Sequence, residues 1–473
     1  MPKNIVIFAD GTGQAGGQRP DQSLSNIYKL FRAARVGPDN RIDPSEQVAF
    51  YDPGLGTEED GGAIPLRALK WYRKSISGAT GTGIGKNIAD CYEAILKHYE
   101  PGDRVFLLGF SRGAYTARCV GGVMGLCGIP TRGKDGAPLP RFGRALRAIA
   151  DEAVSSVYEH GSGKEAQRYK DERNEKARRF RETYASAQAD GTSNEVPYFI
   201  GVFDTVAALG SAGIARIGIL LMHALLLLGL AALVALSLST LFDLGFGASF
   251  TIVAVLVFLA AAGIWLKSNL KVIRDFPAPG KPKWHFARWR LKFYNTELNK
   301  RVRFARHALA IDEERENFAR VPWSVDGALV TYAEGPEWMK QVWFAGNHSD
   351  IGGSYPEDEA RLSDIALKWM VEEAKALPHP LVIDDSKLHL FPSATGMQHS
   401  EVRALWEKYP GWWPERIRKS WPIQRRPVEP RAVLHPTVFE RLRANRVSLY
   451  GTSGPYRPPE LQAHEIAKEH WKT

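Results

Sequence analysis

The sequence predicts an α/β fold built on a mostly parallel sheet with helices on both faces, interrupted by an inserted transmembrane helical hairpin. Three observations lead to this prediction. Apolar, strand-like runs alternate with helical patterns along the chain. One of these runs leads through Gly-Phe-Ser-Arg-Gly (109–113) into a helical pattern. Two long uncharged segments follow each other near the middle of the chain.

The predicted strands share an apolar, β-branched or aromatic composition. They are Asn4–Ala9, Gln47–Tyr51, Val105–Gly109, Val196–Phe203 and Val342–Ala345. Helical spacing is predicted over Asn87–Tyr99 and Ala114–Leu126, and the charged region 151–184 is expected to be helical and to lie on the surface. Strands that are apolar on both faces and alternate with helices are typical of a parallel sheet covered on both sides.

Composition bounds the class of protein. The chain has 473 residues, of which 44% are hydrophobic and 24% charged, so it can bury a sizeable core and is not a disordered chain. Three scattered cysteines (Cys91, Cys119, Cys127) indicate neither a disulfide framework nor a zinc site, and they are expected to be buried thiols. The net charge of +10 favours an anionic neighbour, either nucleic acid or an acidic lipid surface. The N-terminus lacks the long apolar core of a signal peptide.

Two uncharged runs predict the membrane hairpin. Ile217–Phe242 and Leu244–Leu266 each exceed the ~20 residues that a helix needs to cross a bilayer core. The alternative is a pair of helices buried in a soluble core, which two adjacent runs of this length disfavour. We expect the tip of the hairpin near Asp243–Gly247 and both flanks on one side of the membrane, and we expect His223 to pack rather than function.

The flank after the hairpin indicates which side. Residues 267–306 contain twelve Lys or Arg and only two acidic residues, interleaved with aromatic side chains. Positive flanks stay in the cytoplasm, and a basic, aromatic stretch beside a spanning helix suits an anionic leaflet. A nucleic-acid surface would also be basic and aromatic, but the neighbouring hairpin favours lipid. We therefore expect Lys271–Arg306 to contact anionic membrane lipids at the cytoplasmic face, and no nucleic acid.

The Gly-Phe-Ser-Arg-Gly motif predicts a catalytic serine. A nucleophile elbow needs an apolar strand, then G-x-S-x-G, then a helix, since the strained turn lifts the hydroxyl clear of the sheet. Ser111 has this context, with small residues on the following helix that permit close packing. An α/β-hydrolase serine also needs an acid and then a base later in the chain.

Two strand-to-loop junctions downstream supply these partners. Asp204 ends one predicted strand, and His348 follows another, so both side chains can converge on one edge of the sheet. His307 and His435 are the rival histidines, but neither follows a predicted strand directly. Asp350 could replace Asp204 as the acid, although two residues from His348 it is more suited to orienting the loop.

The oxyanion hole needs two backbone N–H groups. Arg112, the residue after the serine, is expected to supply one. The turn after the first strand contains Asp10, Gly11 and Thr12, and it is expected to supply the other from Gly11 or Thr12, with Asp10 in a supporting role. No metal or organic cofactor is expected. The glycine-rich Gly78–Lys86 is not expected to bind nucleotide, because Thr80 stands where a P-loop needs glycine.

The motifs together resemble a known family. DGTG (10–13), PGDRVFLLGFSRGAYTAR (101–118), FDTVAALG (203–210) and VWFAGNHSDIGGSY (342–355) are similar to an uncharacterised bacterial and fungal α/β-hydrolase family whose studied members include type VI secretion phospholipase effectors. YDPGLGT (51–57) and RHALAIDEER (306–315) extend the resemblance. It implies hydrolysis of phospholipid esters by a triad that maps to Ser111, Asp204 and His348. The last ninety residues match only loosely, through HPTVFERL (435–442) and YRPPEL (456–461).

The expected organisation has four parts. Residues 1–212 and 269–380 form the catalytic domain, 213–268 the membrane hairpin, and 381–473 a region rich in Trp, Pro and Arg. That last region is expected to be either a second basic, interfacial surface or a packed cap. The expected function is a membrane-anchored serine hydrolase of lipid acyl esters. The alternative is a catalytically silent membrane scaffold on a hydrolase fold.

Overall fold

The computed structural model describes most of the chain. The described residues are 2–11, 13–14, 16–17, 23–54, 82–161, 168–206, 213–242, 245–286, 297–324, 335–415, 418 and 420–471.

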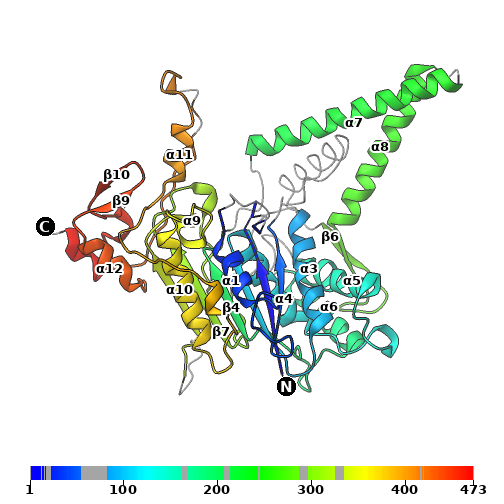
Figure 1. Cartoon of the computed structure of the whole chain (residues 1–473). Helices are drawn as coiled ribbons and strands as arrows, with labels where there is room; N and C mark the ends of the chain where they lie inside the picture. Colours follow the sequence, from blue (N-terminus) through cyan, green and yellow to red (C-terminus); the bar gives the residue numbers. More distant parts are fainter. Residues whose placement is uncertain are drawn as a thin grey trace.

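A six-stranded parallel sheet forms the centre of the molecule (Figure 1). Its order is β2-β1-β3-β4-β7-β8, and every neighbouring pair is parallel. The strands are β2 (Gln47–Asp52), β1 (Asn4–Ala9), β3 (Arg104–Phe110), β4 (Phe199–Phe203), β7 (Phe304–Ala310) and β8 (Met339–Phe344). The predicted α/β fold with a mostly parallel sheet is confirmed.

Helices cover both faces of this sheet. Because successive side chains of a strand point to opposite faces, Ile5 and Ile7 enter one core, whereas Val6 and Phe8 enter the other. The first core is closed by α3 (Thr82–His98), α4 (Arg112–Cys127), α5 (Gly143–Asp151) and α6 (Lys170–Tyr184). The second is closed by α1 (Asn26–Ala34) and α10 (Arg361–Lys375).

Two of the differences between the predicted and the observed elements have a clear physical reason. β7 was not predicted as a strand, because its centre carries Arg306 and His307, both of which are buried. The charged region 151–184 is not one surface helix. It contains a π-helical turn (Glu152–Val157), a 3-10 turn (Tyr158–Gly161) and then α6, whose Ala177, Phe180 and Tyr184 are buried in the first core. Further 3-10 turns lie at 134–136, 316–318, 385–387, 459–461 and 467–471.

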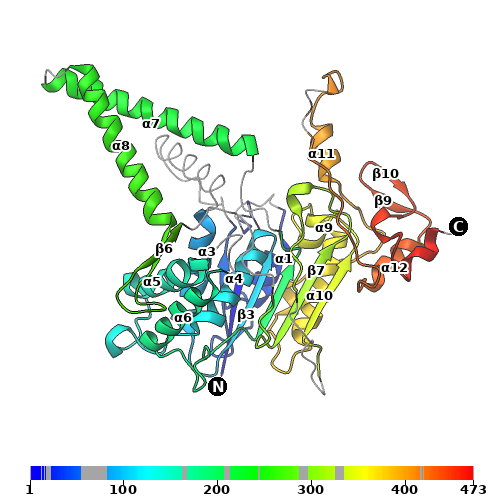
Figure 2. The same cartoon turned by 180° about the vertical axis from the view of Figure 1, so that it is seen from behind.

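The two uncharged runs form long helices that project from the domain (Figures 1 and 2). They are α7 (Gly213–Phe242) and α8 (Phe246–Asn269), and Ala224–Phe242 and Phe246–Lys267 are long and apolar enough to cross a membrane. Only 11% and 6% of these windows is buried, so they are not core helices of a soluble domain. The buried positions include small residues (Ala231, Ala235, Ser249), as at closely packed membrane helices. The predicted tip residues 243–244 and the side chain of His223 lie outside the described part.

A short antiparallel pair lies at the base of the hairpin. β5 (Leu270–Ile273) follows α8 directly and pairs with β6 (Lys283–Phe286). Ile273 is buried, while Trp284 and Phe286 are exposed, and Phe286 stacks on Trp265 of α8. The remaining basic and aromatic residues of 287–296 lie outside the described residues.

The C-terminal region is a packed cap from which one segment projects. Val438, Leu442 and Leu461 join a third core with Leu309 of β7 and Trp343 of β8. This cap contains α12 (Pro436–Arg443), β9 (Val447–Leu449) and β10 (Thr452–Gly454). Leu434 of the cap forms an isolated parallel β-bridge with Trp343 of β8, so the cap covers the β8 edge of the sheet.

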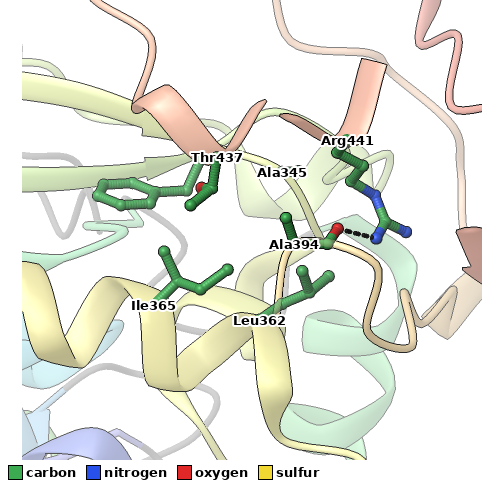
Figure 3. A pocket seen from close by; sticks show the side chains of 7 residues that line it. Ala345, Leu362, Ile365, Ala394, Thr437 and Arg441 are labelled. Atoms are coloured by element: carbon green, nitrogen blue, oxygen red, sulfur yellow. Dashed lines mark hydrogen bonds between the residues drawn. The ribbon is translucent and has the colours of Figure 1, made fainter. Parts of the chain in front are cut away.

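A small pocket marks the seam between the cap and the catalytic domain (Figure 3). Ile365 and Leu362 of α10 point into it from one side and Thr437 of α12 from the other. Arg441 closes one end by donating to the carbonyl of Ala394 at 2.7 Å. No candidate catalytic residue lines this pocket, so we assign it to packing.

By contrast, residues 401–415, which include α11 (Glu401–Glu407), project away from the cap (Figure 1). None of the described residues in this segment is buried, and the Trp412 side chain is 81% exposed.

Candidate active site

Ser111 lies on a sharp turn between β3 and α4. Its backbone has φ 58° and ψ −119°, a conformation that costs free energy for a residue with a side chain. Both flanking residues must be glycine, because neighbouring backbone atoms leave no room for a side chain. A Cβ on Gly113 would stand 2.0 Å from the carbonyl oxygen of Ala9, and one on Gly109 would stand 2.5 Å from that of Gly113. The structure therefore gives G-x-S-x-G the geometry of a nucleophile elbow.

His348 and Asp204 meet beside this turn. Asp204 follows β4, and His348 opens the short helix α9 (His348–Gly352) after β8. Nδ1 of His348 donates to Oδ2 of Asp204 at 2.5 Å. Since an ionised carboxylate can only accept, Nδ1 carries the proton, and Nε2 of a neutral imidazole has a free lone pair. Nε2 is buried and has no hydrogen-bond partner among the described residues.

Aromatic contacts hold the imidazole next to the elbow. The ring of Phe110, the residue before Ser111, lies 4.7 Å from the His348 ring between centroids. Gly352 makes this approach possible, because a Cβ there would stand 1.9 Å from the Phe110 ring. Phe318 packs edge-on against the other side of His348 at 5.0 Å. The Asp204–His348 pair thus lies beside the turn that carries Ser111, at the carboxyl edge of the sheet, where parallel sheets bind ligands.

Arg426 is a partner of Asp204 that the sequence did not predict. Its Nη1 donates to Oδ1 of Asp204 at 2.6 Å and its Nη2 to Oδ2 at 3.0 Å, while the backbone N–H of Ala310 donates to Oδ1 at 3.0 Å. Burial by itself would raise the pKa of Asp204, but the charge of Arg426 and the hydrogen bond from His348 outweigh it and hold that pKa well below its ordinary value. The acid is therefore ionised and fixed in place.

A second ion pair, which the sequence did not predict, contacts the backbone of His348. The backbone N–H of His348 donates to Oε2 of Glu313 at 3.2 Å. Arg315 binds both carboxylate oxygens of Glu313 at 2.7 Å and covers the Phe318 ring at 3.5 Å. Both residues belong to the RHALAIDEER stretch, which the sequence analysis noted without assigning it a role.

Asp350 orients the loop and does not contact the base. Its carboxylate accepts from the backbone N–H groups of Asn347 (3.0 Å) and His399 (3.1 Å) and from Nδ1 of His399 (2.8 Å). Burial raises the pKa of Asp350, an effect that His399 partly offsets. Asp204, not Asp350, is the carboxylate bonded to His348.

One predicted oxyanion donor needs correction. Gly11 lies beside Ser111, since a Cβ there would stand 3.4 Å from Cβ of Ser111. However, the backbone N–H of Gly11 already donates to Oδ1 of Asp10 at 2.7 Å, so it is not available to an oxyanion in this structure. Asp10 also accepts from Ser25 and Tyr51, and burial raises its pKa to about 6 against these hydrogen bonds. Gly11 therefore provides close approach, and Asp10 holds the turn.

Two oxyanion donors stay predictions. Arg112 begins α4, so its backbone N–H is one of the four that a helix leaves without an intrahelical acceptor. Thr12 lies outside the described residues.

The catalytic-domain family described as "T6SS, Phospholipase effector Tle1-like, catalytic domain" matches residues 3–226 and 260–373, well over half of the chain. The chain belongs to this family. The Tle1-like match contains Ser111, Asp204 and His348. It omits 227–259, the middle of the hairpin, and ends before Arg426.

Individual relatives are more distant. The "Uncharacterized protein YEL023C" of Saccharomyces cerevisiae is 31% identical over 134 residues, which is 28% of this chain and 18% of that protein. An uncharacterized protein from Pseudomonas aeruginosa has a TM-score of 0.34 at 15% identity, covering 83% of this chain and 48% of that one. The Tle1 effector bound to the VgrG spike has a TM-score of 0.26 at 16% identity, covering 76% and 53%. The chain thus spans 18% of the yeast protein and about half of each solved chain.

Proposed function

We propose that this Tle1-like protein is a membrane-anchored serine hydrolase that cleaves carboxylic esters, with phospholipid acyl esters as the substrate class. Family membership implies lipid-ester hydrolysis. The observation that carries the finer proposal is the Asp204–His348 pair packed against the turn that holds Ser111.

The chemistry follows from this arrangement. Oγ of Ser111 attacks the acyl carbon while Nε2 of His348 takes its proton, and the carbonyl oxygen becomes an oxyanion held by backbone N–H groups. The tetrahedral intermediate expels the alcohol, which receives that proton, and leaves an acyl-enzyme. Water then attacks the acyl group with His348 again as base, releasing the fatty acid and regenerating Ser111. Asp204 keeps the proton on Nδ1 and stabilises the imidazolium.

The position of the hairpin supports a lipid substrate. The strands run toward the edge of the sheet that carries the candidate site. The helices α7 and α8 project from the end of the molecule at which this edge lies, opposite the N-terminus (Figures 1 and 2). The segment 401–415 projects there too, and its exposed Trp412 suits the headgroup region of a bilayer. We place the catalytic domain at the cytoplasmic face, with the exposed basic residues Arg274, Lys281 and Lys283 against anionic lipids. The predicted contact cannot extend to the end of the stretch Lys271–Arg306, because Arg306 is buried in β7.

Hydrolysis by the purified full chain tests this proposal. In detergent micelles it should turn over a short, water-soluble acyl ester, and in phospholipid vesicles it should release fatty acid. A folded protein that hydrolyses neither substrate would favour the alternative of a silent scaffold on a hydrolase fold.

Removing the hairpin should separate anchoring from catalysis. We expect replacement of residues 213–268 by a short Gly/Ser linker to give a soluble protein, because an insertion can be excised when the surrounding fold does not depend on it. Its rate on a water-soluble ester should stay near the parental rate. Its rate on vesicles should fall, because the anchor raises the local concentration of the site at the lipid surface. Residual vesicle binding through the exposed Arg274, Lys281 and Lys283 should weaken as salt rises.

The two assays together decide the role of the helices. A linker variant that is folded but inactive on the soluble ester would show that α7 and α8 shape the active site. The anchor model would then be wrong.

Removing the charge on Arg426 should damage both stability and rate. Arg426→Gln leaves the buried Asp204 carboxylate without its cationic partner, and breaking a buried ion pair costs about 3–5 kcal/mol. We expect a lower free energy of unfolding, measured by denaturant in detergent, together with reduced turnover. Arg425→Gln is the matched control, because the side chain of Arg425 is 55% exposed and its nearest carboxylate oxygen lies 3.5 Å away. Equal effects of the two variants would contradict the assignment of Arg426.

A further inference from the structure

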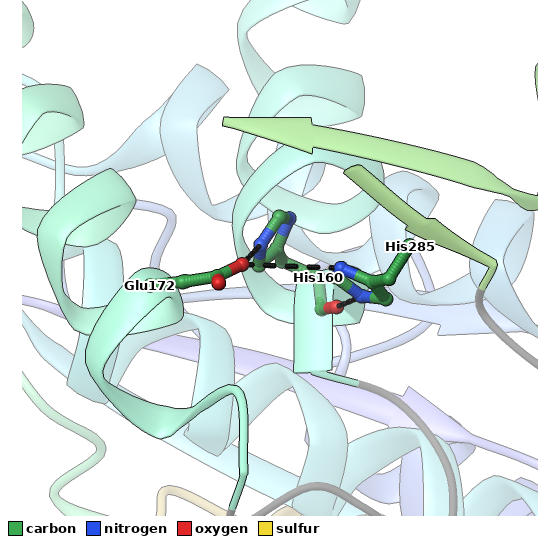
Figure 4. Close-up of side chains that lie close together, drawn as sticks. All are labelled: His160, Glu172 and His285. Atoms are coloured by element: carbon green, nitrogen blue, oxygen red, sulfur yellow. Dashed lines mark hydrogen bonds and ion pairs between the residues drawn. The ribbon is translucent and has the colours of Figure 1, made fainter. Parts of the chain in front are cut away.

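Three metal-ligating side chains converge away from the active site (Figure 4). His160 lies in the 3-10 turn Tyr158–Gly161, Glu172 in the first turn of α6, and His285 in β6. Nε2 of His160 is 2.9 Å from Oε2 of Glu172, and Nδ1 of His285 is 3.8 Å from the same oxygen. One ligand atom from each residue lies within 4.8 Å of the other two.

The side chains are enclosed and their orientation is fixed. The side chains of His160, Glu172 and His285 are only 1%, 13% and 10% exposed. Nε2 of His285 lies 2.8 Å from the carbonyl oxygen of His160, and a carbonyl can only accept, so Nε2 carries the proton. Nδ1 of His285 therefore has its lone pair free, facing Glu172. The ring of Tyr169 stacks on His285 at 3.7 Å and holds this orientation.

This donor set fits one kind of ion. Two imidazole nitrogens and one carboxylate oxygen match the three-ligand sites in which Zn²⁺ keeps a fourth position for water, at metal–ligand distances of about 2.0–2.2 Å. Ca²⁺ and Mg²⁺ prefer sets made of oxygen. The His285 N–H bonded to a backbone carbonyl is the usual outer contact of a metal-bound histidine.

We propose that His160, Glu172 and His285 form a Zn²⁺ site that ties β6 to the catalytic domain. β6 pairs with β5, which continues directly from α8. A bound ion would therefore fasten the base of the membrane hairpin to α6 and the turn before it. The sequence predicted no metal, and these three residues, far apart in the chain, form no local ligand motif. The inference does not depend on the proposed hydrolase activity.

Metal binding by the untagged full chain in detergent micelles tests the site. After removal of metals with a chelator, the protein should bind one Zn²⁺ per chain with a micromolar or lower Kd, measured by calorimetry and elemental analysis. Because the ion binds only the folded state, an excess of about 100 times Kd should raise Tm by several degrees relative to chelator. Co²⁺ in place of Zn²⁺ should give the absorption bands of a site with nitrogen and oxygen ligands.

Variants assign the binding to these residues. Glu172→Gln keeps the shape of the side chain and a hydrogen-bonding oxygen but removes the charge. It should raise the Kd for Zn²⁺ at least about tenfold. His285→Ala should abolish stoichiometric binding, whereas His389→Ala, at an exposed histidine elsewhere, should leave Kd and the Tm shift unchanged. Failure of the parental protein to bind stoichiometric Zn²⁺, or equal binding by Glu172→Gln and the parent, would overturn the proposal.

Discussion

Ser111→Ala is expected to abolish covalent labelling by a fluorophosphonate probe and to lower turnover of a soluble ester by on the order of 10⁴ or more. Without Oγ no acyl-enzyme can form, so His348 and the oxyanion donors are left without a nucleophile. The substitution removes one oxygen atom from a nearly buried side chain, so the fold should survive. Labelling, kcat and thermal unfolding of the same preparation measure the three effects.

Ser349→Ala is the matched control. Ser349 is the neighbour of His348, and its backbone N–H, which alanine retains, donates to Asn347 at 2.9 Å. This variant should label and hydrolyse like the parent. Continued labelling and hydrolysis by Ser111→Ala would show that Ser111 is not the nucleophile.

The parts of the fold that were predictable depend on local sequence. β1 has the bounds that its apolar run predicts, and β3 exceeds its predicted run by one residue at each end. The elbow was predictable because Gly109 and Gly113 meet backbone atoms that leave no room for a side chain. Two helices long and apolar enough to span a membrane were predictable from composition, since no soluble core buries them.

The parts that were missed depend on contacts between distant segments. Arg426 lies 222 residues from Asp204, in an irregular stretch where nothing local distinguishes it from its basic neighbours. β7 was missed because a buried strand with Arg306 in its centre contradicts the apolar pattern. Glu373 on α10 makes that burial tolerable by accepting from Arg306 at 2.5 Å.

The oxyanion turn shows a further limit of pattern reading. The spacing correctly placed Gly11 beside Ser111, but the sequence could not show that Asp10 would accept its N–H. The position of a backbone group follows from topology, whereas its availability depends on which side chain folds back onto it. The same reasoning separates Asp204 from Asp350. Both stand near His348 in the chain or the fold, but Asp204 bonds to His348 and Arg426, whereas Asp350 bonds to His399.

Asp204→Asn should lower kcat on a soluble ester by on the order of 10⁴, because an amide no longer holds the imidazole in the required tautomer or stabilises the imidazolium. It also leaves the Arg426 charge without its partner, so thermal unfolding must confirm that the variant is folded at the assay temperature.

Asp350→Asn is the comparison that identifies the acid. It should lower kcat much less than Asp204→Asn does, because Asp350 bonds to Asn347 and His399 and does not contact His348. An amide oxygen can still accept from those backbone N–H groups, so the loop should hold His348 near its parental position. If Asp350→Asn instead proved the more damaging of two folded variants, the acid would have to be reassigned to Asp350. The contact between Asp204 and His348 would then be structural, and Arg426 would stabilise a fold rather than a catalytic carboxylate.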